Sequence, residues 1–268
     1  MKVKRTSFLL FGLCILLLLV VSARVSPDES RIASETALSG DGTEDAVPVD
    51  ALPQESYAAD AGTEEPEETE PALPTPPELN IGSWQLTLVD SLHVLSSSFA
   101  PDVTEVRDGQ YFDSRAAEEL LEMISGAEEA GYTVTIRTGY RPYATQAYIF
   151  FGKASQIAWD GTVEYADAEE LARKTVAYPG TSEHQLGLAV DLMDSASTAM
   201  VAEDVEELPV LLWLQEHCAE YGFIYRYPKE KQEITGWYEP WHFRYVGKDA
   251  ATYIMENDLC LEEFIELY

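Results

Sequence analysis

The sequence predicts an α+β fold in which a small antiparallel sheet is flanked by helices. Two observations predict this class. Segments with alternating apolar residues and segments with helical spacing follow one another without the regular strand–helix–strand rhythm of a parallel sheet. Apolar residues make up 46 % of the chain and aromatic residues 11 %, so a hydrophobic core can form. The length of 268 residues suits one medium domain with appended segments.

The expected strands are segments in which apolar or β-branched residues alternate with polar ones. WQLTLVD at 84–90 and YTVTIRT at 132–138 have this pattern. LGLAVDLM at 186–193 is instead a continuous apolar run interrupted by a single acidic residue, Asp191. Two later segments are also expected to be strands: FIYRYP at 223–228 and HFRYVG at 242–247.

The expected helices have apolar residues at helical spacing. The segment 114–130 has this spacing, with Ser114 as a candidate N-cap and acidic residues in its first turn. The segment 210–221 is expected to end at Gly222, a good C-cap. Shorter helices are expected at 146–156, 166–175, 248–257 and 261–268.

The first 23 residues resemble an export signal. Lys2, Lys4 and Arg5 give a positive end, and no charge occurs from Phe8 to Val21. This run is short for a membrane span of about 20 residues, but a retained signal anchor stays open as an alternative. In either case we expect the remainder to lie outside the cytoplasm, secreted or anchored to the cell membrane.

Residues 24–80 are acidic, rich in proline and nearly free of aromatic residues. Such a segment cannot bury enough apolar surface to offset its chain entropy, so we expect a disordered, extended tether. The domain is then expected at 81–268. The formal net charge of −31 would repel the phosphate backbone of a nucleic acid, so we expect no DNA or RNA partner. No obligate protein partner is expected either.

The three cysteines do not form a CxxC motif, which argues against a cysteine-based zinc or redox site. Cys14 lies in the apolar N-terminal run. Cys218 and Cys260 remain for the folded part, where either a disulfide or two ordinary apolar residues would fit.

Two of the four histidines lie in unusual surroundings. Asp191 interrupts an apolar strand, and a buried carboxylate needs a partner such as a metal. His184 precedes Asp191 by seven residues, across glycine-bearing sequence that allows a bend. His242 follows Glu239 and a proline, so both side chains can approach the same point. Two imidazoles and one carboxylate would leave tetrahedral zinc one open position, as in catalytic sites, and Glu239 could serve as a general base.

A third cluster is RTGYRPY at 137–143, followed by Gln146. Arg141 comes after a strand and a glycine, so its guanidinium can point into a cleft and bind a carboxylate or oxyanion. The residues alone leave plainer alternatives open: a strand-end salt bridge for Asp191 and a solvated turn for Arg141. The remaining histidines, His93 and His217, are expected to be structural.

The segments SEHQLGLAVDL and EPWHFRYVG resemble the two signature segments of the zinc D-Ala-D-Ala carboxypeptidases. These enzymes belong to a group that also contains lysostaphin-like peptidases and the hedgehog signalling domain. GYRPYATQ resembles the arginine turn of that family. WQLTLVD and the stretch from FIYRYP to HFRYVG resemble its VanY-type branch. The match covers roughly 84–246, with several separated motifs in the same order.

The resemblance implies a small sheet carrying one zinc ion, held by His184, Asp191 and His242. It implies that Glu239 is the base and that Arg141 holds the substrate carboxylate or the tetrahedral oxyanion. It further implies substrate contacts from two other residues, Gln146 and Ser182. Thr138 stands where the family often has serine, and Leu186 where threonine is common, which leaves substrate preference open.

The resemblance therefore implies hydrolysis of the C-terminal D-alanine bond in peptidoglycan stem peptides. Two related activities stay open: an L,D-carboxypeptidase that trims tetrapeptides and a dipeptidase, which an exported location disfavours. A cell-wall peptide-binding domain without catalysis is an alternative of another class, which an intact Glu239 argues against. A signalling ligand of the hedgehog type is a remote alternative, because the tether and the VanY-type segments argue against it.

Overall fold

The structure is a computed structural model that describes residues 73–199 and 201–268. The expected export signal or anchor at 1–23, Cys14 and the expected tether up to residue 72 lie outside the described residues. Within the described ranges, no helix is both long enough and apolar enough to span a membrane.

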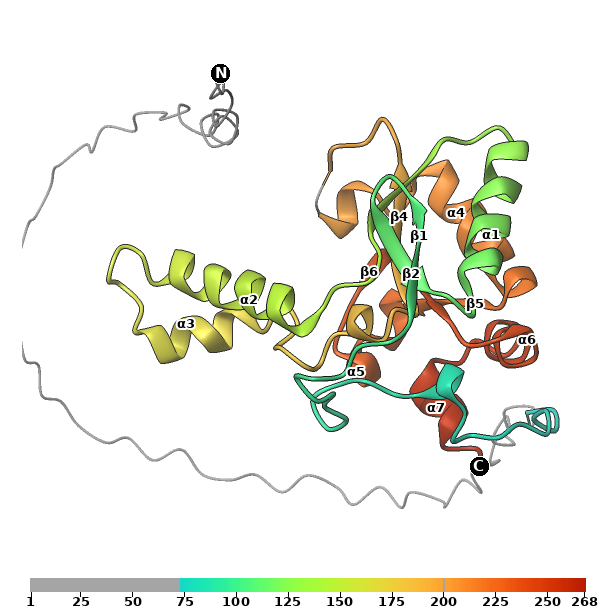
Figure 1. The fold of residues 1–268 in the computed structure, drawn as a ribbon, viewed down its shortest axis with the longest axis horizontal. Helices are drawn as coiled ribbons and strands as arrows, with labels where there is room; N and C mark the ends of the chain where they lie inside the picture. Colours follow the sequence, from blue (N-terminus) through green and yellow to red (C-terminus); the bar gives the residue numbers. More distant parts are fainter. Residues whose placement is uncertain (1–72, 200) are drawn as a thin grey trace, which may run out of the picture. The chain divides into compact units, whose positions relative to one another are not determined.

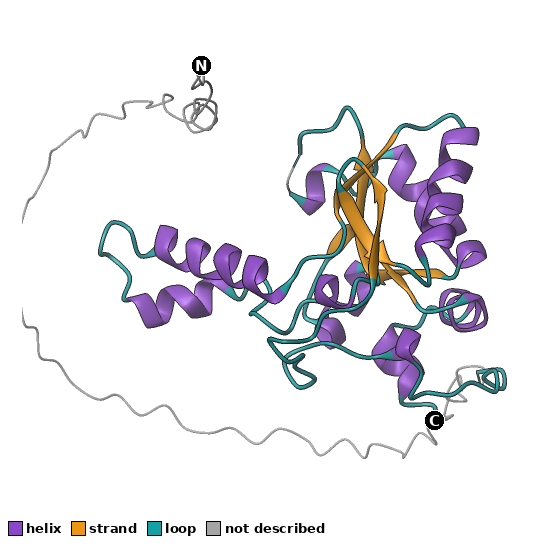
Figure 2. Ribbon diagram, viewed as in Figure 1, coloured by secondary structure: helices purple, strands orange, loops and turns teal. Residues whose placement is uncertain are grey.

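A four-stranded antiparallel sheet forms the centre of the fold, in the strand order β3-β4-β6-β5 (Figures 1 and 2). Its strands are β3 (Val134–Thr138), β4 (Ala189–Asp194), β5 (Phe223–Tyr227) and β6 (Glu239–Tyr245). Each neighbouring pair is antiparallel. The expected α+β class, with a small antiparallel sheet flanked by helices, is confirmed.

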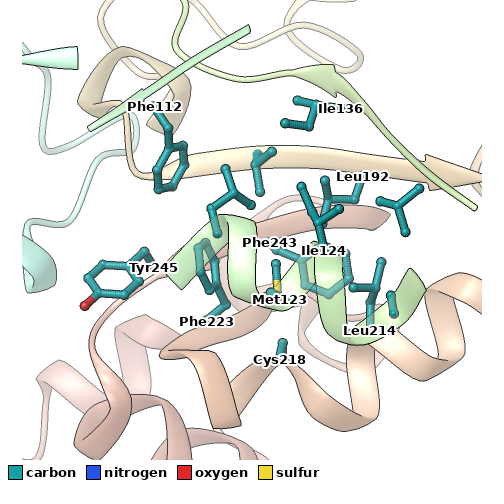
Figure 3. Close-up of a cluster of buried hydrophobic side chains, with 14 of the residues drawn as sticks. Phe112, Met123, Ile124, Ile136, Leu192, Leu214, Cys218, Phe223, Phe243 and Tyr245 are labelled. Carbon is teal, nitrogen blue, oxygen red and sulfur yellow. The ribbon is translucent and has the colours of Figure 1, made fainter. Parts of the chain in front are cut away.

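One face of the sheet is buried in the main hydrophobic core. Val190 and Leu192 of β4 and Phe243 of β6 lie in this core. Helices α1 (Ala117–Glu129) and α4 (Pro209–His217) cover it, and Figure 3 shows their apolar side chains meeting those of the strands. Because side chains alternate across a strand, the residues between these apolar ones point to the opposite face.

Helix α4 continues into a 3-10 turn, Cys218–Tyr221, and the whole segment ends at Gly222 as expected. Gly222 has a φ of 84°, in the left-handed region, and an added Cβ would lie 2.9 Å from the ring of Tyr245. Glycine is therefore required here both by the backbone conformation and by the close packing.

A separate hairpin consists of β1 (Val103–Arg107) and β2 (Gln110–Asp113). Its turn residues, Asp108 and Gly109, have φ values of 54° and 75°. Asp-Gly is well suited to a two-residue turn in which both residues have positive φ. The backbone of Tyr111 in β2 packs against the end of β3, where the amide of Tyr140 donates to the Tyr111 carbonyl at 2.6 Å.

Helices α2 (Tyr143–Ile157) and α3 (Tyr165–Ala172) form a pair that projects from the sheet in Figures 1 and 2. They pack through a small apolar cluster that includes Phe150 and Ala154 of α2 and Ala172 of α3. Both helices were expected at nearly these positions. Helix α2 begins two residues after Arg141, so the first turn of this helix pair lies beside the sheet.

The C-terminal helices are α6 (Lys248–Glu256) and α7 (Leu261–Ile265), also close to the expected positions. They form a second apolar cluster with Leu79 and Ile81, and the Tyr253 hydroxyl donates to the Pro74 carbonyl at 2.6 Å. Residues 73–80, which we expected to belong to the tether, therefore contact the domain.

The alternation at 84–90 predicts a strand, and this prediction is wrong. Trp84–Leu86 forms a 3-10 helix, and an irregular segment follows. The carbonyls of Gln85 and Thr87 accept hydrogen bonds from Nη2 of Arg244, at 2.9 and 2.8 Å. A buried guanidinium thus satisfies backbone groups that a strand would have paired with a neighbouring strand.

Ser114 was expected to cap the first helix, but α1 begins three residues later with Ala116 at its N-cap. The cause lies at Asp113. Its carboxylate accepts from the backbone amide and from the guanidinium of Arg115, and its carbonyl accepts from the Ala116 amide at 3.0 Å. These bonds form a turn that postpones the start of the helix.

Cys218 and Cys260 are both buried and both free, so the disulfide alternative is wrong. Cys218 lies in the main core. Both thiols behave as small apolar groups, the alternative left open by the sequence.

Candidate active site

Sheet register brings Asp191 and His242 together. Asp191 of β4 is the direct cross-strand partner of His242 of β6. Directly opposed residues have their side chains on the same face, with Cβ atoms about 4.5–5.5 Å apart. His242 Nδ1 accordingly lies 3.0 Å from Asp191 Oδ1. Both side chains point away from the core that contains Val190 and Phe243.

His184 reaches the same point from a short 3-10 helix, Glu183–Leu186, that precedes β4. Gly187 ends this helix with a φ of 73°, and a Cβ there would lie 3.2 Å from Pro101. The bend expected between His184 and Asp191 is therefore present. His184 Nε2 lies 3.3 Å from Asp191 Oδ2.

The other nitrogen of each imidazole has its own acceptor. Nδ1 of His184 lies 2.9 Å from the Gly139 carbonyl, and Nε2 of His242 lies 3.3 Å from Glu183 Oε2. Donation from these nitrogens leaves a lone pair on Nε2 of His184 and on Nδ1 of His242, both directed toward Asp191. Metal-binding histidines typically have this arrangement.

One ligand atom from each of His184, Asp191 and His242 lies within 4.8 Å of the others. Two neutral imidazole nitrogens and a carboxylate oxygen form a donor set that zinc accepts, with one coordination position left for water or substrate. Both histidines are 3 % exposed, while the Asp191 side chain is 15 % exposed. The residues present therefore fit one metal ion, and the site that they form opens to the cavity on one side.

The charges in this cluster influence one another strongly. Burial opposes ionisation of Asp191, but His184 and His242 outweigh it and hold the pKa of Asp191 far below its usual range. Burial also opposes protonation of His242, but hydrogen bonds to Asp191 and Glu183 raise its pKa to about 9 in the metal-free site, so metal binding would release a proton from Nδ1. For His184 burial dominates and lowers its pKa.

Glu239 begins β6 and stands beside the metal-facing nitrogen, with Oε2 3.4 Å from His242 Nδ1. Burial is the main cause that raises the pKa of Glu239 to about 7, and the Asp191 charge adds to it. His242 and Arg141 oppose this shift. Glu239 lines the same cavity as the three candidate ligands without belonging to their cluster.

Arg141 occupies the turn between β3 and α2, where its backbone amide donates to the His184 carbonyl at 3.0 Å. Its Nε is buried without a hydrogen-bond partner. Burial lowers the pKa of Arg141, although Asp191 and Glu239 favour its charged form. An incompletely paired guanidinium at a cavity wall is suited to bind an incoming carboxylate.

The cavity has a volume of about 520 Å³, within the range of pockets for small ligands. Gln146 and Ser182, the two further substrate contacts that the resemblance implies, also line it. Gln146 is 1 % exposed; its Nε2 donates to the Ala177 carbonyl, and its Oε1 is buried without a partner. Ser182 is buried next to the candidate ligands. Aromatic side chains complete the wall: Tyr227, Trp237 and Trp241.

The other two histidines lie outside this cavity. His93 is paired with Asp90, and His217 with Glu220. Each pair joins residues three positions apart in the chain, so neither histidine connects distant elements.

Three buried charged residues behind His242 are absent from the sequence-based prediction. They are Glu183, Arg226 and Arg244. A signal was available for the two arginines, because each stands directly between two aromatic residues of an expected strand. Glu183 gave no such signal, because an acidic residue next to Ser182 in a loop is usually exposed.

Two imidazoles and a carboxylate in a cavity, with a second carboxylate and an arginine beside them, are typical of a metal-dependent hydrolase. The family model described as D-alanyl-D-alanine carboxypeptidase, VanY, matches residues 109–248. The chain belongs to the VanY family of D-alanyl-D-alanine carboxypeptidases. The family resemblance stated from the motifs is confirmed.

Two curated relatives are similar over most of the domain. The putative carboxypeptidase YodJ of Bacillus subtilis is 37 % identical over 192 residues, which cover 68 % of this chain and 67 % of the relative. A D-alanyl-D-alanine carboxypeptidase of Enterococcus faecalis is 37 % identical over 183 residues, covering 68 % and 66 %. The chain thus matches about two thirds of the length of these relatives.

Three solved structures are similar in fold and sequence. The vancomycin-resistance D,D-pentapeptidase VanY, as a mutant in complex with Zn(II), has a TM-score of 0.59 and 37 % identity and covers 68 % of this chain and 99 % of its own. VanYB in complex with D-alanine-D-alanine has a TM-score of 0.60 and 36 % identity, and the match covers 69 % of this chain and 98 % of VanYB. The L,D-carboxypeptidase LdcB has a TM-score of 0.58 and 37 % identity, and the match covers 67 % of this chain and 84 % of LdcB.

Proposed function

We propose that the chain is an extracytoplasmic zinc D-alanyl-D-alanine carboxypeptidase that removes the C-terminal D-alanine from peptidoglycan stem peptides. The observation that carries the proposal is the convergence of His184, Asp191 and His242 within 4.8 Å at a cavity that also contains Glu239 and Arg141. A VanY relative bound to Zn(II) and VanYB bound to D-alanine-D-alanine support both the cofactor and the substrate class.

His184, Asp191 and His242 would hold the ion. When bound, zinc supplies Lewis acidity, which polarises a carbonyl and lowers the pKa of water to about 7. Glu239 stands at the open side of this cluster, 3.4 Å from His242 Nδ1, where its carboxylate can take a proton from the attacking water. The same carboxyl group can then return that proton to the leaving amine.

Arg141 positions the substrate. Its guanidinium lines the cavity and has a buried Nε without a partner, so it can bind the terminal carboxylate of the peptide. Gln146 Oε1 is a second unpaired buried polar atom on this wall; it is an acceptor and can receive an N–H of the substrate. Ser182 completes the proposed contacts. Together these groups would fix the scissile bond beside Glu239.

The proposed location outside the cytoplasm depends on the N-terminal segment, with its basic end and uncharged run from 8 to 21. Whether the segment is cleaved or retained decides between a secreted and a membrane-anchored enzyme. The acidic, proline-rich segment that follows would hold the domain away from the membrane.

A second candidate activity is supported by the similarity to the L,D-carboxypeptidase LdcB, which matches as well as VanY in sequence identity. The two activities differ in the bond that is cut. A D,D-carboxypeptidase removes D-alanine from a pentapeptide, whereas an L,D-carboxypeptidase removes it from a tetrapeptide. Mass analysis of products from both defined peptides separates them.

The catalytic assignment is tested with Glu239→Ala. The variant should keep its zinc content but lose hydrolysis by about 10²–10⁴-fold, the usual contribution of a general base. Full turnover by a zinc-loaded Glu239→Ala protein would contradict the mechanism. Zinc binding without any hydrolysis by the unmodified chain would instead indicate a peptide-binding domain.

A further inference from the structure

Behind the candidate metal ligands lies a buried charged cluster that the proposed reaction does not use. It consists of Glu183, Arg226, Arg244 and Glu262. The side chains of Glu183 and Arg244 are 0 % exposed and that of Arg226 is 1 % exposed, whereas Glu262 of α7 is 17 % exposed. The cluster contains two positive and two negative groups, so its formal charge is balanced.

The two carboxylate oxygens of Glu183 have different hydrogen-bond partners. Oε1 accepts from Arg226 Nε and from Arg244 Nη1, both at 2.8 Å. Oε2 is thereby left for Nε2 of His242, at 3.3 Å. Two guanidinium groups from two strands therefore fix the orientation of the carboxylate, and the carboxylate faces the histidine nitrogen that points away from the candidate metal position.

The two arginines are themselves held firmly. Arg226 forms a bidentate pair with Glu262, at 2.8 and 2.7 Å. Arg244 donates to the carbonyls of Gln85, Thr87 and Tyr245. Helix α7 is in turn fixed at its start, where Glu263 accepts from the Cys260 amide and pairs with Lys231. A chain of charge-assisted hydrogen bonds thus runs from α7 to His242.

Stability alone does not account for this arrangement. Buried ion pairs are expensive to desolvate, and apolar residues of similar volume often stabilise a protein as well or better. A fixed carboxylate on the outer nitrogen of a metal-binding histidine, in contrast, sets its tautomer and increases its basicity. We therefore expect the cluster to affect metal binding by His242 more than the stability of the fold.

We infer that Glu183 is a positioning residue for His242, and that Arg226 and Glu262 hold Glu183, so that α7 contributes to metal affinity without contacting the metal. This inference rests on the proposed metal centre formed by His184, Asp191 and His242. It adds a support from the C-terminal helix to a site whose candidate ligands lie on β4, on β6 and on the 3-10 helix that precedes β4.

The test measures zinc affinity of the full chain by competition with a chromophoric chelator, so it requires no peptide substrate. Glu183→Gln keeps the shape of the side chain but removes its charge, and we expect zinc affinity to fall by about 10- to 100-fold. Glu262→Gln should give a smaller loss. Glu266→Gln is the matched control, because it removes the same charge from the end of α7 and has no contact in the cluster.

A double variant separates positioning from simple loss of folding. Glu183→Gln leaves two arginines against one carboxylate, whereas Glu183→Gln with Arg244→Gln restores the balance of charge, because Arg226 keeps its bidentate pair with Glu262. The double variant should regain thermal stability relative to Glu183→Gln but still bind zinc weakly. Recovery of both stability and affinity would assign Glu183 a purely structural role and overturn the inference.

Two further results would also overturn it: wild-type zinc affinity in Glu183→Gln, or equal affinities for Glu262→Gln and Glu266→Gln. The absorption spectrum of the cobalt-loaded variants provides a second readout, because a reoriented His242 changes the ligand field. Failure of the unmodified chain to cleave stem peptides would contradict the proposed function, but it would leave these zinc affinities unchanged.

Discussion

Gly139 links the packing of the hairpin to the candidate metal site. Its carbonyl accepts from His184 Nδ1 at 2.9 Å, and its amide donates to Gln110 Oε1 at 3.0 Å. A Cβ at this position would lie 2.4 Å from the carbonyl oxygen of Tyr111. Real Cβ atoms essentially never come closer than 3.0 Å to a non-bonded heavy atom of another residue, so Gly139→Ala must displace backbone.

Two measurable losses follow from that displacement. Overpacking against a backbone that cannot rotate away should lower the free energy of unfolding by about 1–3 kcal/mol. Movement of the Gly139 carbonyl should weaken its hydrogen bond to His184 and lower zinc affinity by about 10- to 100-fold, the usual effect of losing such a support. Urea unfolding of the metal-free protein and chelator competition measure the two losses separately.

Gly152→Ala is the matched control. Gly152 lies in α2, and an added Cβ would meet nothing within 4 Å. Alanine favours a helix interior over glycine by about 0.8–1.0 kcal/mol, so this variant should be slightly more stable and bind zinc normally. If Gly139→Ala unfolded at the wild-type urea concentration and bound zinc with wild-type affinity, the reasoning about this contact would be refuted.

Further predictions concern the substrate clamp and the thiols. Arg141→Lys keeps the charge but loses the planar fork, so kcat/KM on a stem peptide should fall by about 10- to 100-fold with zinc content unchanged; a wild-type kcat/KM would remove Arg141 from the substrate site. Burial raises the pKa of Cys218 and of Cys260 to about 12, so neither thiol should react with iodoacetamide at pH 8 unless the chain is unfolded. The pKa of each thiol in the folded state lies above its ordinary value of 9.0. The free energy of unfolding should therefore be unaffected by these thiols below pH 9 and should decline as pH rises toward 12, because only the unfolded chain loses their protons in that range; urea titrations across the range measure this decline.

The sequence predicts much of the fold because the apolar patterns are local. Strand β3 and helices α2 and α6 lie close to their expected positions, since alternation and helical spacing can be recognised within each segment. The segment 84–90 shows the limit of this reasoning. Its alternation is genuine, but its carbonyls bind Arg244, a residue more than 150 positions away. No local pattern contains that contact.

The candidate site was predictable to the extent that its residues violate local patterns. Asp191 in an apolar strand and His242 in an aromatic one are conspicuous, and the structure brings them together with His184. Their role as zinc ligands stays a prediction. Glu183 is not conspicuous, because its burial depends on Arg226 of β5 and Arg244 of β6, which are distant in the sequence. Only the assembled fold shows that Glu183 and Glu262 together balance the two arginines.

The most direct test of the account is product analysis with the purified full chain and a pentapeptide that ends in D-Ala-D-Ala. The account predicts release of one D-alanine, complete loss of this activity after zinc is removed by a chelator, and its return on addition of one zinc ion per chain. Undiminished activity in protein shown to contain no metal, or a product that retains both D-alanines, would contradict it.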